Sequence, residues 1–155
     1  PARGKIAGAY ANSAFIKTDA ARAGFDEALV LTQEGHVSEG SAMNVFMLRD
    51  GVLVTPSITE NVLEGITRRS IIELAREELG LTVVERPIDR TEVYLAEELF
   101  LTGTAAQVTA VTRVDYRPIG SGEMGPVTSQ LRRLFDDILR GRVEKYHKWL
   151  TPVYS

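Results

Sequence analysis

The chain has 155 residues, of which 44% are hydrophobic and 25% are charged, and its formal net charge at pH 7 is −3. These values are typical of one globular domain with a core of its own, and no apolar run approaches the roughly 20 residues of a membrane span. Lysine and arginine are scattered among acidic residues without interleaved aromatic residues, which disfavours binding to nucleic acid.

Cysteine is absent, and the two histidines, His36 and His147, are far apart in the sequence. This composition excludes disulfides, thiolate catalysis and cysteine-based metal sites, and it gives no ligand spacing for a metal ion. No signal-peptide pattern is present. We therefore expect a cytoplasmic protein without a metal, a membrane contact or a nucleic-acid partner.

The first part of the chain predicts a helix followed by strands. Residues 11–23 are rich in alanine and predict a helix, which Gly24 ends. Residues 28–32 and 44–48 are apolar runs that predict strands. The dipeptide Asp50-Gly51 then separates the second strand from residues 52–55, which is typical of a β-hairpin.

The middle of the chain continues with both kinds of element. Residues 67–79 have apolar side chains at helical spacing and predict a helix that Gly80 ends. Asp89 and Glu92 have the spacing of a capping box, so we expect a short capped helix there. Three further strands are predicted, at residues 81–85, 99–102 and 108–111.

A long helix is predicted to open at Pro126 and to close at Gly141. Six apolar residues fall on one face of this helix and are expected to be buried: Val127, Leu131, Leu134, Phe135, Ile138 and Leu139. Strands and helices are interspersed without a repeat or a linker. The sequence therefore indicates a single mixed α+β domain.

Four short segments contain side chains that can carry chemistry. They are residues 5–10 (KIAGAY), 38–40 (SEG), 65–68 (GITR) and 102–105 (TGTA). Together they supply an amine, a phenol, a carboxylate and two loops with backbone donors for anions. Taken singly, each has an ordinary explanation, such as a surface amine, a core aromatic residue, a solvated charge, a helix cap or a turn.

In order and spacing, the four segments resemble the large-domain motifs of the branched-chain amino acid aminotransferases, which are class IV enzymes of fold type IV that use pyridoxal 5′-phosphate. The resemblance runs from Lys5 to about Leu139. It implies a cofactor-binding large domain over residues 1–155, with strands in a pseudo-barrel and flanking helices. The family also carries an N-terminal small domain before the lysine, to which nothing in this sequence corresponds.

The resemblance assigns roles to the first two segments. Lys5 would form the Schiff base with the cofactor and act as acid and base for the proton shift, and the phenol of Tyr10 would contact the ring hydroxyl. Glu39 would keep the pyridine nitrogen protonated, which makes the ring an electron sink. Asn44 would help to orient this wall of the pocket, and Leu63 would pack on a face of the ring.

The other two segments are assigned to anions. Gly65, Ile66 and Thr67 would cradle the cofactor phosphate at a helix start, although Thr67 has an alternative interpretation as a simple N-cap. The hydroxyl of Thr104 would contact the phosphate, and the backbone amides of Thr104 and Ala105 would face the α-carboxylate of the substrate.

The implied reaction transfers an amino group between a branched-chain L-amino acid and 2-oxoglutarate, so the partners are small amino and 2-oxo acids. A homo-oligomer, dimeric or larger, is also implied. Two alternatives stay open: another class IV member, such as a D-amino-acid or amine transaminase, and a truncated, inactive domain for cofactor binding or assembly. We expect the chain alone to bind the cofactor weakly and to expose an apolar face.

Overall fold

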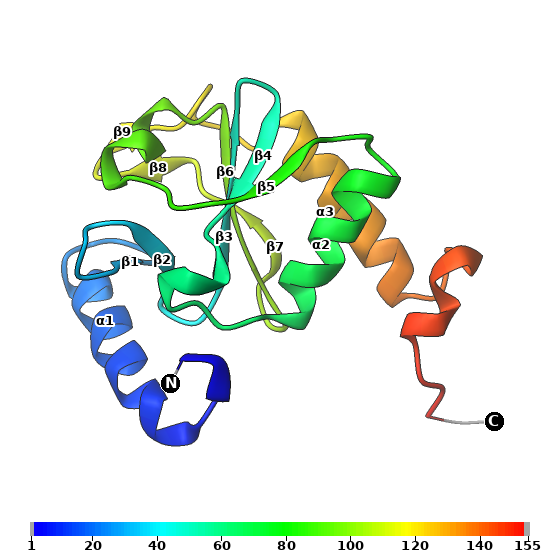
Figure 1. Cartoon of the computed structure of the whole chain (residues 1–155), viewed down its shortest axis with the longest axis horizontal. Coiled ribbons are helices and arrows are strands. Elements are labelled where there is room, and N and C mark those ends of the chain that lie inside the picture. The colour runs from blue at the N-terminus through cyan, green and yellow to red at the C-terminus, as the bar shows by residue number, and fades with distance from the viewer. Residues whose placement is uncertain (1, 154–155) are drawn as a thin grey trace.

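The structure is a computed structural model that describes residues 2–153, with strands at its centre and helices around them (Figure 1). Three α-helices are present in these residues: α1 (Tyr10–Arg22), α2 (Ile66–Glu77) and α3 (Pro126–Leu139). Five 3₁₀ helices accompany them: η1 (Ala2–Gly4), η2 (Ala7–Ala9), η3 (Ile58–Glu60), η4 (Arg90–Leu95) and η5 (Glu144–Trp149). None of these helices is both long and apolar enough to cross a bilayer.

The main sheet has five strands in the order β5-β4-β3-β6-β7. Their bounds are β3 (Asn44–Arg49), β4 (Val52–Thr55), β5 (Val83–Glu85), β6 (Glu98–Gly103) and β7 (Gln107–Ala110). All neighbours are antiparallel except β4 and β5, which are parallel. The predicted hairpin joins β3 and β4, and Asp50 and Gly51 have φ angles of 51° and 70°, as a tight primed turn requires.

Two short hairpins complete the strands. They are β1 (Leu29–Leu31) with β2 (Val37–Gly40), and β8 (Arg113–Val114) with β9 (Arg117–Pro118). The sequence did not predict β2, β8 or β9. Asp115 and Tyr116 make the β8–β9 turn with φ angles of 49° and 65°, and this turn was missed because neither residue is glycine or asparagine.

Apolar side chains alternate along the central strands and form a core on each face of the sheet. In β3, Phe46 and Leu48 face α2 and α3, whereas Val45 and Met47 belong to a second cluster under β2 and η4. The rings of Phe46 and Phe100 stack across β3 and β6 at 5.1 Å. Because both faces are covered, these strands read as nearly continuous apolar runs in the sequence.

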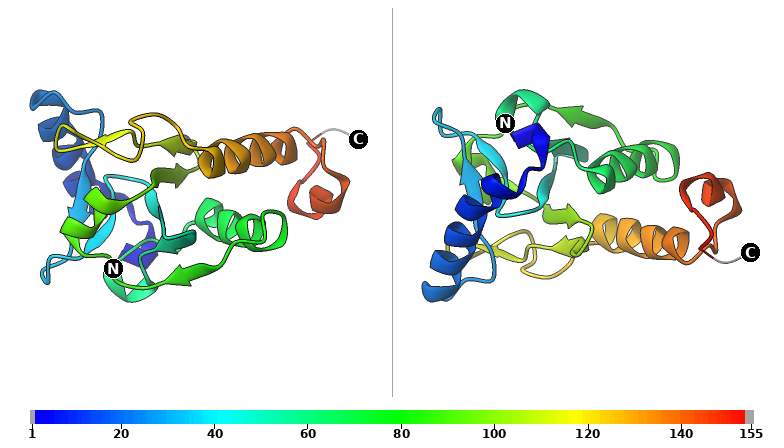
Figure 2. Two further views of the ribbon diagram at one scale, coloured as in Figure 1. Left: turned by 90° about the horizontal axis from the view of Figure 1, so that it is seen from above. Right: turned by 90° about the horizontal axis from the view of Figure 1, so that it is seen from below.

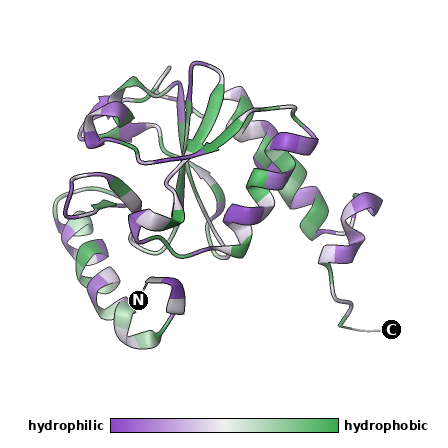
Figure 3. Cartoon of the chain, in the orientation of Figure 1, coloured by the Kyte–Doolittle hydropathy of each residue, from purple (hydrophilic) through white to green (hydrophobic). Residues whose placement is uncertain are grey.

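Helices α2 and α3 lie side by side on one face of the sheet (Figure 2). Hydrophobic and hydrophilic residues alternate along both helices, as expected for helices with one buried side (Figure 3). The predicted buried face of α3 is largely confirmed. Leu139 is a correction: it is 45% exposed, because it lies at the last turn beyond the edge of the core.

Two further features differ from the sequence-based expectations. The capping box at Asp89 does not form, since the carboxylate of Glu92 is held instead by the guanidinium groups of Arg49 and Arg86. The tail also has defined structure: Tyr146 in η5 is buried, and its hydroxyl donates to Glu78 Oε1 at 2.7 Å. Mixed α+β architecture with flanking helices is otherwise confirmed.

Candidate active site

A cavity of about 740 Å³ opens between α1 and the end of the main sheet. Its walls come from the N-terminal segment, from the β1–β2 hairpin, and from the segments that lead into β3, into α2 and out of β6. All ten residues that the sequence assigned to the site line it: Lys5, Tyr10, Glu39, Asn44, Leu63, Gly65, Ile66, Thr67, Thr104 and Ala105. The fold thus brings four segments that are distant in the sequence to one place.

Lys5 and Tyr10 form the first functional pair. The amine nitrogen of Lys5 lies 2.7 Å from the hydroxyl oxygen of Tyr10 and 5.3 Å from the centre of its ring. The 3₁₀ turn of η2 brings the two side chains together, and Lys5 itself has a φ of 37°, which is uncommon for a residue with a side chain. An amine and a phenol thus share one edge of the cavity.

Glu39 is the partly buried carboxylate of the cavity wall, and neutral groups donate hydrogen bonds to it. Its Oε2 accepts from the backbone N–H of Leu63 at 3.0 Å and from Nδ2 of Asn44 at 3.2 Å. The same Asn44 nitrogen donates to the carbonyl of Leu63 at 2.8 Å. Asn44 is buried at the start of β3, so it links β2, β3 and the segment before α2.

Burial raises the pKa of the Glu39 carboxyl group above its usual value, and the bond from Leu63 and the charge of Lys5 offset this only in part. Among residues 2–153, Glu39 has no ion-pair partner. A cation on the cavity side would therefore stabilise its charged form. This environment suits a ligand that carries a protonated nitrogen.

The start of α2 faces the cavity. Gly65 is the N-cap residue, and the first helical bond is donated by the N–H of Arg69 to its carbonyl, so the amides of the first turn have no partner within the helix. The helix begins at Ile66, slightly earlier than predicted, and Thr67 is inside it rather than at the cap. A Cβ atom at Gly65 would collide with Oδ1 of Asn44, so only glycine fits here.

Thr102 is a site residue that the sequence reasoning quoted in a motif but did not select. It pairs with Asn44 across β3 and β6, lines the cavity, is fully buried, and its hydroxyl has no hydrogen-bond partner within residues 2–153. A buried hydroxyl without a partner is costly unless a ligand satisfies it. The cross-strand register that reveals it cannot be read from the sequence.

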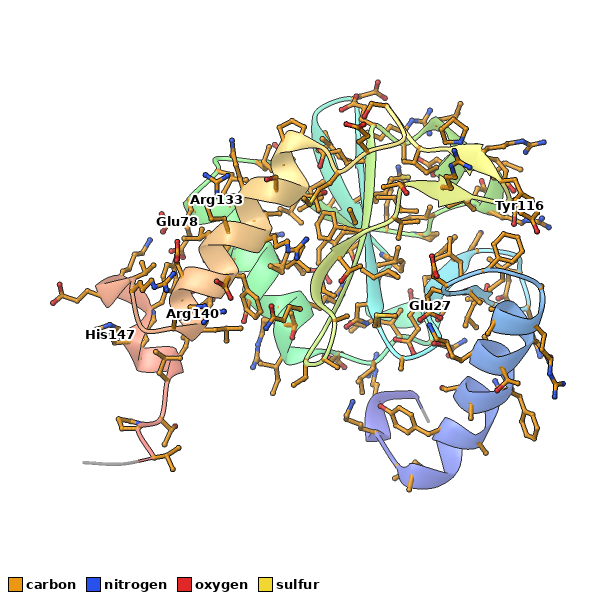
Figure 4. The ribbon with its side chains drawn as sticks, turned by 180° about the vertical axis from the view of Figure 1, so that it is seen from behind. Glu27, Glu78, Tyr116, Arg133, Arg140 and His147 are labelled. Atoms are coloured by element: carbon orange, nitrogen blue, oxygen red, sulfur yellow. The ribbon has the colours of Figure 1, made fainter. Side chains whose placement is uncertain are left out.

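Several apolar side chains in and near the cavity segments are exposed. Ile66, which lines the cavity, is 76% exposed, and Ile6 and Phe15, which are next in sequence to the lining residues Lys5 and Ile16, are 52% and 71% exposed. Beyond the end of α1, Glu27 accepts from the backbone N–H of Ala28 and Ser41, and the ring of Tyr116 lies 4.7 Å from that of Phe25 at an angle of 44°. Figure 4 shows Glu27 and Tyr116 in this part of the molecule. The chain after α1 is thus attached to the loop that follows β2 and to the β8–β9 turn.

Together, the sheet and its flanking helices hold one cavity whose wall carries an amine, a phenol, a half-buried carboxylate and a helix start. Comparison with protein families matches residues 2–114 to the family described as amino-transferase class IV. The chain belongs to this family.

Curated relatives within this family are named as branched-chain-amino-acid aminotransferases. A probable branched-chain-amino-acid aminotransferase of Aquifex aeolicus (strain VF5) is 53% identical over 155 residues, which is all of this chain and 50% of the relative. The chain spans about half the length of the curated relatives that it matches.

Solved structures of the same kind of enzyme have this fold. The branched-chain amino acid aminotransferase of Thermobaculum terrenum in its PLP form has a TM-score of 0.97 and 47% identity, and the match covers 100% of this chain and 50% of that one. A second solved branched-chain amino acid aminotransferase, complexed with N-(5′-phosphopyridoxyl)-L-glutamate, has a TM-score of 0.96 and 46% identity, covering 99% and 52% of the two chains. The fold-type IV architecture is thereby confirmed.

Proposed function

We propose that residues 1–155 form the cofactor-binding large domain of a pyridoxal-phosphate-dependent aminotransferase that acts on branched-chain L-amino acids and 2-oxoglutarate. One observation carries this proposal: the ten residues assigned from the sequence all line a single cavity. The names of the relatives, and the phosphopyridoxyl-glutamate held by one solved relative, support the same chemistry.

The cavity fits pyridoxal phosphate at three places. Glu39 offers a carboxylate whose charged form needs a cation, as the protonated pyridine nitrogen provides. The first turn of α2 offers free amides and a favourable dipole for the phosphate. The third place is the wall at Thr102, whose buried hydroxyl has no hydrogen-bond partner within residues 2–153.

Each residue then has a defined task. When bound, the cofactor supplies an electrophilic carbon and a ring that accepts the electron pair released at the α-carbon of the substrate. Lys5 Nζ holds the cofactor and moves the proton at the α-carbon, and Tyr10, 2.7 Å from that amine, keeps it oriented. Glu39 keeps its charge opposite the ring nitrogen, while Asn44 and the backbone of Leu63 fix the carboxylate.

The substrate end of the cavity is the loop after β6. We assign the backbone amides of Thr104 and Ala105 to the α-carboxylate, because both residues are exposed on the cavity wall. Ile6, Phe15 and Ile66 expose apolar surface that association would bury, in agreement with a homo-oligomer of two or more chains.

Cofactor attachment tests the proposal directly. The chain is incubated with pyridoxal phosphate, reduced with borohydride and digested, and the modified peptide is mapped; we expect the label on Lys5. Lys17 and Lys145 are internal controls. Lys17 is bound to the carbonyl of Asp26, and the pKa of Lys145 is raised above its usual range by Glu78 and Glu77, which keeps its amine protonated. Labelling of either control in place of Lys5 would contradict the assignment.

Donor specificity separates the alternatives. In a polypeptide of the relatives' full length that contains this chain, L-leucine should convert the bound cofactor to its amine form, as followed by absorbance. Conversion by D-alanine or by a simple primary amine instead would favour another class IV member. A bound cofactor that no donor converts would favour an inactive binding domain.

A further inference from the structure

The segment between β4 and α2 is attached at two points to β2 and to the residue just before it. At the first point, Ser38 Oγ donates to the carbonyl of Glu60 at 2.6 Å, and His36 Nδ1 lies 3.1 Å from Glu60 Oε2. At the second point, Leu63 donates its N–H to Glu39. Residues 36, 38 and 39 thus hold residues 60 and 63.

The contact between His36 and Glu60 joins an imidazole to a carboxylate that is almost completely buried. Glu60 is 8% exposed and His36 is partly buried. A carboxylate only accepts, so the ring nitrogen of His36 is the donor. The other carboxylate oxygen accepts from Thr59 Oγ1 at a longer 3.3 Å. Without His36, this carboxylate would keep a single weak neutral donor while remaining buried.

The two residues between these attachments transmit the position of Glu60 to Leu63. Asn61 has a left-handed φ of 57°, which fixes the direction of the chain as it leaves η3. Val62 is 1% exposed and anchors its backbone in the core. The path from Glu60 to the N–H of Leu63 is therefore short and constrained at each step.

We propose, on the basis of the function proposed above, that His36 and Glu60 are positioning residues for the active site. By holding Glu60, His36 places the backbone N–H of Leu63 against the carboxylate of Glu39 and the apolar side chain of Leu63 in the cavity wall. The pair touches neither cofactor nor substrate, and it acts through Leu63 and Glu39.

Loss of the pair has a defined consequence. A buried carboxylate that loses its shorter hydrogen bond is destabilised, so the segment shifts to bring Glu60 to water. The N–H of Leu63 then leaves Glu39. Because this hydrogen bond lowers the pKa of Glu39 against the effect of burial, its loss makes the carboxyl group more readily protonated and a poorer partner for a cationic ring nitrogen.

The test compares three substitutions by NMR hydrogen exchange of the Leu63 amide in the cofactor-free chain. We expect His36→Leu to speed this exchange about tenfold, and to weaken binding of pyridoxal phosphate by a similar factor. His36→Asn should bring both the Leu63 exchange rate and the affinity for pyridoxal phosphate back to within about twofold of the wild type, because the asparagine amide nitrogen replaces Nδ1 as the donor. His147→Leu is the matched control. His147 lies at the far end of the molecule from Glu27 and the cavity, and its substitution should change neither value (Figure 4).

Unchanged Leu63 exchange in a folded His36→Leu variant would overturn the inference. Equal effects of His36→Leu and His36→Asn would also overturn it, because a purely steric role would then suffice. If His36→Leu does not fold, Glu60→Gln replaces it, since glutamine keeps the volume and an acceptor; its Leu63 exchange should rise about threefold, and no rise would again contradict the pair's role. Failure of a polypeptide of the relatives' full length that contains this chain to bind the cofactor would refute the proposed function and leave the exchange test intact.

Discussion

Helices α1 and α3 have nearly the same length, 13 and 14 residues, and were both predicted from the sequence, yet they differ in what they bury. Helix α3 buries Thr128, Leu131, Phe135 and Ile138 against the sheet. Within residues 10–22 no residue is buried, and Ala9, the residue that precedes α1, provides no side-chain cap. Most helical stability comes from packing of an apolar face.

This difference in burial indicates that the two helices have different roles. Helix α3 belongs to the core that holds the sheet together. Helix α1 forms a wall of the cavity with Tyr10, Ser13 and Ile16, so its position matters for ligand binding more than for stability. Substitutions in the two helices should therefore affect different properties of the protein.

The largest effect is expected from removing a core side chain of α3. Leu131 is fully buried, so Leu131→Ala should lower the free energy of unfolding by about 3 kcal/mol through lost burial and the cavity left behind. Phe15→Ala in α1 is the matched comparison. It removes a larger side chain that is 71% exposed and should change stability by less than about 0.5 kcal/mol. Urea unfolding measures the free energy of unfolding of both variants. Similar decreases in the two variants would contradict the proposed difference between the helices.

An intermediate effect is expected at the start of α3, which is capped from outside the helix. The buried carboxylate of Glu98 accepts from the N–H groups of Val127 and Thr128 at 2.9 and 2.7 Å, and from the hydroxyl of Thr128 at 2.6 Å. Glu98→Gln replaces one acceptor oxygen with a donor and removes the charge, so it should cost about 2 kcal/mol.

The neighbouring Glu97→Gln is its control. Glu97 is exposed and accepts one backbone N–H, from Asp50, so its substitution should cost less than about 0.5 kcal/mol in the same urea experiment. Equal costs for the two glutamates would show that the cap of α3 contributes nothing beyond surface charge.

The smallest effect on stability is expected on the cavity side, where Glu39→Gln should stabilise the cofactor-free chain slightly. Burial raises the folded-state pKa of Glu39 above its unfolded value. A carboxyl group of this kind lowers the stability of the folded chain as pH rises through its folded-state pKa, because its charged form is then buried. At neutral pH the variant should therefore have a higher free energy of unfolding than the wild type. This difference should vanish below the unfolded-state pKa, near pH 4. Urea unfolding at several pH values measures this difference. The same variant should bind pyridoxal phosphate more weakly, and a lower stability at neutral pH would contradict the assigned cause of the shift.

Local signals in the sequence determined much of the fold. Asp50-Gly51 specified the β3–β4 turn because both residues tolerate positive φ, and Pro126 and Gly141 marked the ends of α3. Apolar periodicity predicted α2 and the central strands. The four motifs, together with Asn44 and Leu63 near two of them, also named ten residues that line one cavity, since the order of the motifs along the chain matched that of a known family.

Only the tertiary structure decided how distant groups meet. Glu92 bonds two arginines in place of its own helix start, Thr102 faces Asn44 because of the β3–β6 register, and Glu39 accepts the N–H of a residue 24 positions away. No local pattern encodes such contacts. They depend on strand register and on which groups burial leaves without water, and both are properties of the packed chain rather than of any segment of it.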